Sequence, residues 1–263
     1  MNILINMAEK VKENKRIDVD TTKSELKGLA GFIESFLRKF RMASYLIALI
    51  PLYFFCLLAM GISASPGIFI FNLISEKTVH WWPVLHDISL GFGIVTAYFL
   101  YGISILFVIP LFNFLIPLRL KPFRGPYYSL TSVPWYIHNA FTYVVRYTFL
   151  EFVTPTPLNV LFYKMMGMKV GKGVHINTTN ISDPALIELE DKVTIGGSAT
   201  IIAHYASQGY LIVERVKIGK GTTIGIKATI MGDVEIGAGA VIAPHEVVYP
   251  KSRIPAGRKN KEG

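Results

Sequence analysis

The chain has 263 residues, of which 51% are hydrophobic and only 17% are charged, whereas an average globular domain has about 25% charged residues. With a mean hydropathy of +0.42, this composition argues against an ordinary soluble enzyme. The single cysteine, Cys56, excludes a disulfide scaffold and a cysteine-rich zinc or iron–sulfur site. The formal net charge of +9 predicts an anionic neighbour: a membrane surface, a nucleic acid or a phosphorylated cofactor.

The N-terminal segment, residues 1–40, is expected to be cytoplasmic. Residues 26–41 mix apolar side chains with Arg38, Lys39 and Arg41. This pattern predicts a short amphipathic helix on the inner leaflet of a membrane. A solvated linker helix is the alternative.

Residues 43–75 and 88–118 contain no Asp, Glu, Lys or Arg. Each run exceeds the roughly 20 apolar residues that a helix needs to cross a bilayer. Core helices of a soluble protein are the alternative, but such helices rarely lack charge on every face for so long. We expect one span over 44–64, a break at Pro66 and Gly67, and residues 67–74 turning back or lying at the interface. The second span is expected over 86–109, ending at Pro110.

Basic residues indicate the orientation of these spans. Many precede the first run, and Arg119, Lys121 and Arg124 follow the second, whereas the connection between the runs holds only Lys77. Because basic loops stay on the cytoplasmic side, both ends should be cytoplasmic. Residues 127–166 are also apolar but are interrupted by prolines, Arg146 and Glu151. They predict interfacial helices rather than a third span, so the membrane and interfacial part covers 41–166.

Beyond Met168, aliphatic residues recur at every sixth position, at Ile218, Ile224, Ile230, Ile236, Ile242, Val248 and Ile254. Neither a helical period of 3.6 nor a strand period of 2 produces this spacing. It predicts a parallel β-helix over residues 167–257, in which three hexads close one coil, followed by a basic tail, 258–263.

Two irregularities interrupt the six-residue phase. One extra residue lies between Ile176 and Leu189, and a longer insertion lies between Ile201 and Ile218. Residues 204–211 in the second insertion are expected to leave the prism as a loop. A prism of so few coils exposes flat faces, so packing against copies of itself is expected.

These hexads resemble the hexapeptide-repeat acyltransferases. The segment KPFRGPYYS (121–129) and residues 154–196 and 199–225 resemble the membrane-anchored C-terminal region of poly-lysine-synthetase-type proteins. The resemblance implies a mixed fold, with an α-helical membrane domain of two transmembrane helices and interfacial helices followed by a left-handed parallel β-helix. It also implies a homotrimer whose active sites lie between neighbouring prisms.

The function implied by the resemblance is that of a membrane-anchored O- or N-acyltransferase. It would transfer an acetyl or similar group from acyl-CoA to a hydroxyl or amine of a cell-envelope or lipid-linked acceptor. The β-helix would lie on the cytoplasmic side of a bacterial inner membrane. A non-catalytic trimeric assembly module of a membrane-bound biosynthetic complex is the alternative. A zinc-binding carbonic anhydrase prism is disfavoured because His175, His204 and His245 fall at unmatched coil positions, so no metal is expected. No nucleic-acid partner is expected either.

Acyl transfer requires a base beside the attacking oxygen or nitrogen. His204 lies where the hexads give way to the expected loop, and His175 precedes the inward-facing Ile176 and should point outward. Both are candidates, and His245 is a weaker one. A carboxylate commonly orients a catalytic imidazole, and the candidates for this role are Asp183, Glu214 and Glu188.

The cofactor site is expected at the corners of the coils. Small residues there, Gly225 and Ala243, would leave a narrow groove for the pantetheine arm of acyl-CoA. Lys227, Lys251 and Arg253 would pair with its phosphates. Asn177 and Thr178 are further candidates for holding an acceptor hydroxyl.

Overall fold

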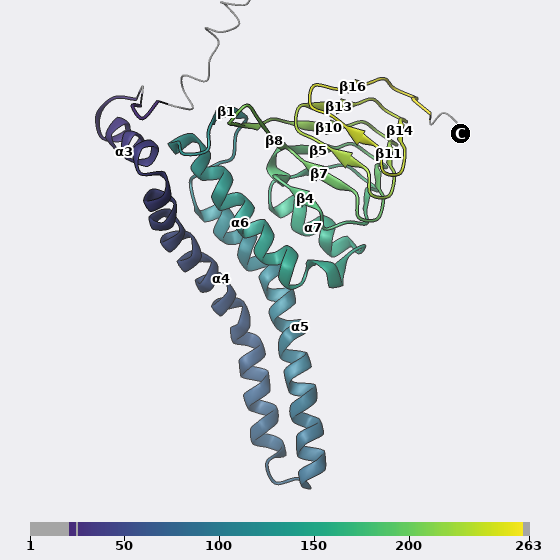
Figure 1. The fold of residues 1–263 in the computed structure, drawn as a ribbon. Coiled ribbons are helices and arrows are strands. Elements are labelled where there is room, and N and C mark those ends of the chain that lie inside the picture. Colours follow the sequence, from purple (N-terminus) through teal and green to yellow (C-terminus); the bar gives the residue numbers. More distant parts are fainter. Residues whose placement is uncertain (1–20, 25, 260–263) are drawn as a thin grey trace, which may run out of the picture.

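The structure, a computed structural model, describes residues 21–24 and 26–259. A long helical hairpin projects from one end, short helices form a middle layer, and a three-sided β-helix completes the chain (Figure 1). The polar start of the N-terminal segment and residues 260–263 of the predicted basic tail lie outside the described residues. Arg258, the first residue of that tail, still belongs to the last coil, because its carbonyl accepts a hydrogen bond from the Val241 amide at 2.8 Å.

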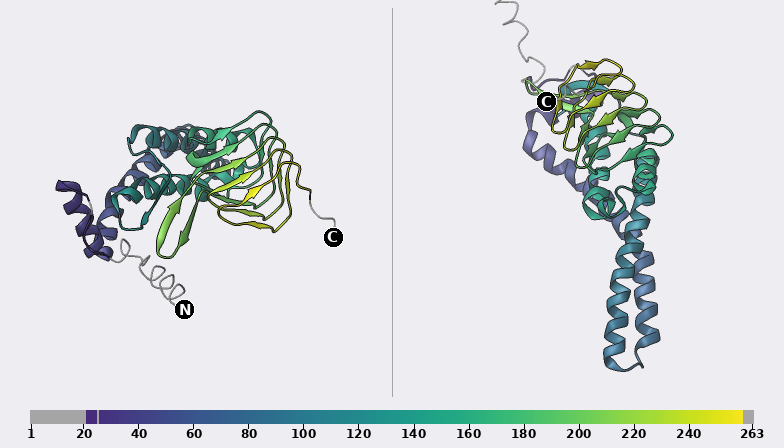
Figure 2. Two further views of the ribbon diagram at one scale, coloured as in Figure 1. Left: turned by 90° about the horizontal axis from the view of Figure 1, so that it is seen from above. Right: turned by 90° about the vertical axis from the view of Figure 1, so that its right-hand side faces the viewer.

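The chain begins with α3 (Gly28–Lys39), which lies within the predicted amphipathic stretch. Its apolar side chains Leu29, Phe32 and Phe36 are exposed. The helices α4 (Arg41–Thr78) and α5 (Pro83–Leu115) form the hairpin, which extends well beyond the rest of the molecule (Figure 2). Within the described residues, these two helices are the ones long and apolar enough to cross a membrane.

The predicted break at Pro66 and Gly67 is wrong, because α4 continues through both residues to Thr78. Ala59, Ser63 and Gly67 follow one another at four-residue spacing and are all buried. Small residues at this spacing let two helix backbones approach closely. A Cβ atom on Gly67 would lie 2.5 Å from the Ala97 carbonyl oxygen of α5. The glycine therefore serves helix packing, and the packed neighbour stabilises the helix around its proline.

The predicted end of the second span at Pro110 is also wrong. Helix α5 runs on to Leu115, and Pro110 is buried inside it. Proline removes one helix hydrogen bond, and a helix tolerates this loss where neighbouring elements pack around it. The middle layer provides that packing, since α5 contacts both α6 and α7.

Replacing Gly67 with leucine should separate the hairpin helices, because the new side chain would collide with the backbone of α5. We expect a loss of about 1–3 kcal/mol in stability, which is typical of overpacking. The thermal midpoint of the detergent-solubilised protein measures this effect. Gly61→Leu is the matched control, because a Cβ at Gly61 meets nothing within 4 Å. Equal midpoints for the two variants would contradict the packing account.

The middle layer consists of short elements that are too short to cross a bilayer: β1 (Phe123–Pro126), η1 (Leu130–Ser132), α6 (Val133–Thr148), η2 (Leu150–Val153) and α7 (Pro157–Met165). Two of its charged residues are bound to the β-helix. Arg146 donates a hydrogen bond to the Asn180 side chain, and Glu151 accepts one from the Thr179 hydroxyl at 2.8 Å.

The predicted parallel β-helix is confirmed. Its first sheet contains β2 (Lys169–Val170), β5 (Ile187–Leu189), β10 (Val216–Ile218), β13 (Val234–Ile236) and β16 (Arg253–Ile254). The second contains β3 (His175–Ile176), β6 (Thr194–Ile195), β11 (Thr223–Ile224) and β14 (Val241–Ile242). The third contains β4 (Ile181–Ser182), β7 (Thr200–Ile202), β12 (Thr229–Ile230) and β15 (Val247–Val248). All pairs within these sheets are parallel, and the aliphatic residues stack in register: Ile195, Ile224 and Ile242 pair in one column.

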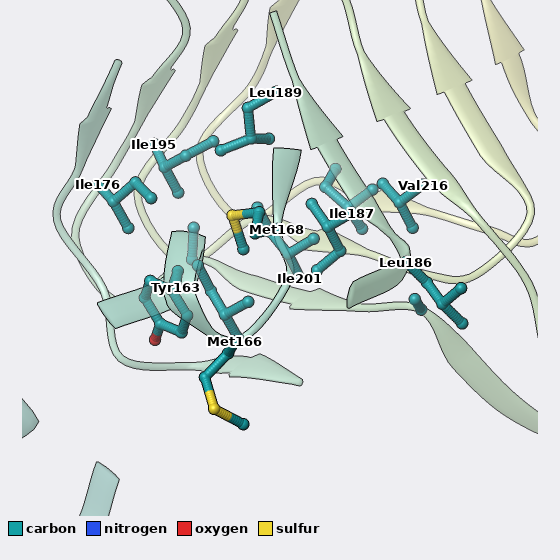
Figure 3. Close-up of a cluster of buried hydrophobic side chains, with 14 of the residues drawn as sticks. Tyr163, Met166, Met168, Ile176, Leu186, Ile187, Leu189, Ile195, Ile201 and Val216 are labelled. Carbon is teal, nitrogen blue, oxygen red and sulfur yellow. The ribbon is translucent and has the colours of Figure 1, made fainter. Parts of the chain in front are cut away.

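The base of the prism is closed by α7 and the residues that follow it. Figure 3 shows Tyr163, Met166 and Met168 beside the inward-facing aliphatic side chains of the first coils. Tyr163 and Met166 are fully buried. A solenoid needs such a cap, because its terminal coil would otherwise expose the core. The first coils therefore lie next to the helical layer, and the last coil lies furthest from it (Figure 1).

The second phase break is a β-hairpin rather than the predicted loop. Strands β8 (His204–Ser207) and β9 (Tyr210–Val213) pair antiparallel, and β1 adds a third antiparallel strand to β9. The Arg124 guanidinium lies 3.4 Å from the centre of the Tyr210 ring across this junction. As predicted, these residues leave the prism. They form a regular sheet there because β1, a strand far away in the sequence, pairs with β9.

Candidate functional site

Both phase breaks fall at the same corner of the prism, between the third and first sheets. Asp183 follows β4 at the first break, and His204 begins β8 at the second. The two side chains meet there, with His204 Nδ1 2.5 Å from Asp183 Oδ2. The irregular positions of the repeat thus hold two of the predicted catalytic residues in direct contact.

The Asp183 carboxylate is fully buried. Its second oxygen, Oδ1, accepts a hydrogen bond of 2.7 Å from Asn139 Nδ2 on α6. The residue has a φ of +59°, a left-handed conformation that is uncommon outside glycine and costs backbone energy. Pro184 then starts the short helix η3 (Pro184–Leu186). The carboxylate is therefore fixed by its turn and by hydrogen bonds to both oxygens.

The His204 ring is held by this carboxylate and by a T-shaped contact with the Trp135 ring, whose centre lies 5.1 Å away. Its side chain keeps 20% of its exposure. With Nδ1–H donating to Asp183, the lone pair of Nε2 stays available, and no residue in the described part of the chain forms a hydrogen bond with Nε2. A partly shielded imidazole oriented by a carboxylate is the arrangement of a general base.

One face of α6 covers this pair. Trp135, Asn139 and Tyr143 are spaced by four residues, so they lie on the same side of the helix. Trp135 contacts His204, Asn139 binds Asp183, and the Tyr143 hydroxyl lies 3.3 Å from Ser182 Oγ. The sequence analysis did not assign these three residues to the site. A polar Asn between two aromatic residues at helical spacing was the available signal.

His138 lies one residue before Asn139 and is also buried. Its Nδ1 is 3.2 Å from Asn113 Oδ1 on α5. Burial lowers the pKa of His138 to about 4, against a smaller raising effect of the Asp183 carboxylate. His138 is therefore neutral at pH 7 and lies inside the protein, between α5 and the site.

The protein should lose stability as the pH falls from about 6.5 to about 4. The folded state keeps His138 neutral in this window, whereas the unfolded state binds a proton at the ordinary histidine pKa of about 6.5, so acid favours unfolding. The contribution is about 3 kcal/mol at the acid end of the window. Thermal midpoints at pH 7.5 and pH 5 measure it, with His138→Asn as the comparison. An equal loss of stability in wild type and variant would contradict this origin.

The other predicted site residues lie elsewhere. His175 is exposed on the second sheet, and His245 is exposed in a turn with a φ of +60°. The Glu214 amide binds the Ala203 carbonyl at 2.8 Å, but its carboxylate has no hydrogen bond to His204. Glu188 pairs with Lys169 on the first sheet. The Thr178 hydroxyl is buried and donates to the Ala199 carbonyl, so it is unavailable for holding the hydroxyl of an acyl acceptor.

The structure divides the predicted cofactor residues between two corners. Gly225, Lys227 and Ala243 lie between the second and third sheets, whereas Lys251 and Arg253 lie at or beside the corner of His204. The backbone of Gly232 stacks on Ala203 and His204, and the Lys251 amide binds the Asp233 carbonyl one coil further on. The Arg253 guanidinium forms an ion pair with the Asp233 carboxylate at an N–O distance of 2.7 Å. Lys251 has no ion pair within the described residues.

Residues 21–24 and 26–259 contain no group of three or more His, Cys, Asp or Glu side chains placed to hold a metal ion. The pair itself offers one imidazole nitrogen and one carboxylate that bind each other.

Comparison with known proteins identifies the repeat. Residues 215–245 match the family model described as "Bacterial transferase hexapeptide (six repeats)". The chain is 30% identical over 143 residues to a Bacillus subtilis (strain 168) protein named "Putative acetyltransferase YvoF", with 49% of this chain and 80% of that protein covered.

A second relative is the delta-poly-L-ornithine synthetase of Acinetobacter baumannii (strain AB307-0294), which is 21% identical over 179 residues. That match covers 66% of this chain, and the chain spans only 13% of the synthetase. Among solved structures, the serine acetyltransferase of Neisseria gonorrhoeae is 14% identical, with 73% of this chain and 62% of that chain covered at a TM-score of 0.34.

Proposed function

The chain belongs to the hexapeptide-repeat transferase family, and from that membership we propose that it is a membrane-anchored, acyl-CoA-dependent acyltransferase. The observation that carries the proposal is the contact between His204 and the buried Asp183 at a corner of the prism. The relative from Bacillus subtilis is named as an acetyltransferase, which supports acetyl or a similar small acyl group as the one transferred. The acceptor is a hydroxyl or amine.

In this mechanism, His204 Nε2 takes the proton from the acceptor oxygen or nitrogen as that atom attacks the thioester carbonyl. A bond forms between the acceptor and the acyl carbon, and the carbon–sulfur bond breaks. The imidazolium then returns the proton to the departing CoA thiolate. Asp183 is a positioning residue that holds the ring through Nδ1 and stabilises its positive charge. Asn139 and Trp135 fix the carboxylate and the ring in turn.

Acyl-CoA would lie along the corner that His204 shares with Lys251. Two coils separate the levels of these residues, or about 10 Å at the usual spacing of about 4.8 Å between strands. Lys251 would bind a phosphate of CoA, since a lysine ammonium without an ion pair suits that role. Gly225, Lys227 and Ala243 lie at the opposite corner of the third sheet. In a trimer, these residues of a neighbouring prism would contact the acyl-CoA instead.

We place α4 and α5 across the bacterial inner membrane, with the β-helix on its cytoplasmic side, where cytosolic acyl-CoA can reach it. Their length and apolar character support this placement. The distribution of basic residues supports the orientation. His80 and His86 would then lie at the far end of the hairpin, away from the site (Figure 1).

A cysteine introduced at Val79 should react with an impermeant maleimide added outside intact cells, whereas one at Lys259 should not. Val79 follows α4 directly and is 55% exposed, and Lys259 is exposed beyond the last coil. Thr78 would be a poor reporter, because it is buried and bound to His86 at 2.8 Å. The background should carry Cys56→Ala, which removes the native thiol. The reverse labelling pattern would contradict the orientation.

We further propose a homotrimer in which the prisms lie side by side, with the left-handed coil of the family. Ile226 and Val247 support this assembly, since both are exposed aliphatic side chains on the upper coils of the prism. They lie on or beside the third sheet, away from the part of it that α6 covers. A neighbouring prism would bury them and would bring its own corner toward the CoA groove.

Two measurements on the purified full chain test the proposed function. Acetyl-CoA should raise the thermal midpoint, because a ligand stabilises the state that binds it. With total membrane lipid as acceptor, free CoA thiol should be released at a rate that depends on enzyme concentration. A non-catalytic assembly module would give neither a midpoint shift nor thiol release, and that result would reject the proposal.

A further inference from the structure

A groove between α4 and α6 leads from the apolar surface of the hairpin to Trp135 and Asn139, the α6 residues that contact His204 and Asp183. Its volume is about 720 Å³, within the range of about 300–1,000 Å³ that is usual for small-molecule sites. Apolar side chains from both helices form its walls, among them Leu49, Leu52, Leu57, Met60, Ala140 and Val144.

The inner end of this groove lies beside the site and is formed by the α6 residues that hold the Asp183–His204 pair. Trp135, Asn139 and Tyr143 line the groove and also contact His204, Asp183 and Ser182. Asn139 is 5% exposed, and its Oδ1 has no hydrogen-bond partner among the described residues. The same holds for Nε1 of Trp135. Unpaired polar atoms are costly inside a protein, and this unpaired donor and acceptor give the inner end of the groove a polar character.

The outer end of the groove opens toward the hairpin surface. Tyr53, Leu57 and Tyr147 line it there and are 57%, 67% and 74% exposed. Tyr53 and Leu57 belong to the apolar helix α4 that we place in the bilayer. Tyrosine is typical of the level at which lipid chains meet headgroups. The groove thus has an apolar entrance on α4 and an inner end beside Trp135 and Asn139, which contact the Asp183–His204 pair.

We infer that the groove holds a hydrocarbon chain of a membrane lipid, whose headgroup hydroxyl or amine is the acyl acceptor presented to His204. This inference rests on the proposed function and names its acceptor class. A soluble acceptor would leave the apolar walls exposed, whereas an amphiphilic lipid matches both ends of the groove. The headgroup oxygen or nitrogen gains the acyl carbon, CoA leaves as the thiol, and the proton passes through Nε2 of His204.

Photo-crosslinking tests this inference. The full chain is reconstituted in phosphatidylethanolamine and phosphatidylglycerol vesicles that contain phosphatidylethanolamine with a diazirine in one acyl chain. After illumination, cross-links are expected on Ala140 and Val144, which are partly buried groove residues of α6. Leu57→Trp should reduce these cross-links roughly fivefold or more by filling the groove. Leu58→Trp is the matched control, because Leu58 is also exposed on α4 but does not line the groove.

Cross-links confined to the outer faces of α4 and α5, equal in both variants, would overturn the inference. The acetyl-CoA midpoint shift and thiol release with a water-soluble amine are measured on the same samples. If acetyl-CoA binds and is turned over but the groove is not labelled, the inference of a lipid acceptor is wrong and the proposed function is retained. If the groove is labelled but acetyl-CoA neither binds nor reacts, the groove still binds lipid chains and the proposed function falls.

Discussion

Replacing His204 with alanine should lower the rate of acyl transfer by about 10²–10⁴-fold, the usual cost of losing a general base. The alanine leaves no group that can take the acceptor proton, while Asp183 remains bound by Asn139 on its other oxygen. The core should survive, since the His204 side chain is partly exposed and lies outside the stacked aliphatic columns. Initial rates of thiol release from acetyl-CoA measure the effect.

His175→Ala is the control for this experiment, because His175 is an exposed histidine on a different sheet of the same prism. It should retain full turnover. Both variants should keep the acetyl-CoA midpoint shift of wild type, which separates loss of chemistry from loss of binding. If His175→Ala abolishes turnover and His204→Ala does not, the base is His175 and our assignment is wrong.

Replacing Asp183 with asparagine should cost at least about 100-fold in turnover, because the neutral amide cannot hold the ring in its productive tautomer. An amide N–H facing Nδ1 would make Nδ1 the acceptor and place the proton on Nε2, so the base would lose its lone pair. The midpoint should also fall, because Asp183 is fully buried and bridges His204 and Asn139. Turnover is therefore compared at a temperature at which both proteins are folded.

Glu214→Gln is the matched control for Asp183→Asn. Glu214 was an equally plausible orienting carboxylate by sequence, but its side chain has no hydrogen bond to His204. Its turnover should stay within about twofold of wild type, the range of a neutral surface change. A large loss in Glu214→Gln together with normal turnover in Asp183→Asn would reverse the roles of the two residues.

The β-helix was predictable from the sequence because each hexad is a local unit. The spacing of Ile218, Ile224 and Ile230 repeats whatever the rest of the chain does, and the strands form where it indicates. The two phase breaks were also readable, and they proved to be the positions of Asp183 and His204. Their contact was not readable, because it depends on how the chain turns at two separate coils.

The helical half was predicted less well because proline and glycine are ambiguous in apolar sequence. Pro66 and Gly67 read as a break, yet the four-residue spacing of Ala59, Ser63 and Gly67 places all three against α5. Such residues can either break a helix or let it pack closely against another, and only knowledge of the partner helix distinguishes the two. In the same way, β1 acquires its role from β9, which lies far along the chain.

The role of α6 at the site could not be predicted from local pattern. Trp135, Asn139 and Tyr143 read as parts of an interfacial helix, and their contacts with the prism arise from tertiary packing. The predicted cofactor residues shared a composition of small and basic side chains, but the coil register divides them between two corners. Periodicity assigns residues to strands and corners, whereas the choice of corner depends on the phase of each coil.

Lipid acylation by this chain can be measured as transfer of radiolabel from acetyl-labelled acetyl-CoA to lipid in vesicles that contain the full chain. Organic extraction separates labelled lipid from acetyl-CoA and free acetate. The account predicts label in the lipid fraction, in equal amount to the thiol released, and no such label with His204→Ala. Thiol release with all of the label recovered as acetate, or lipid labelling that is unchanged in His204→Ala, would contradict it.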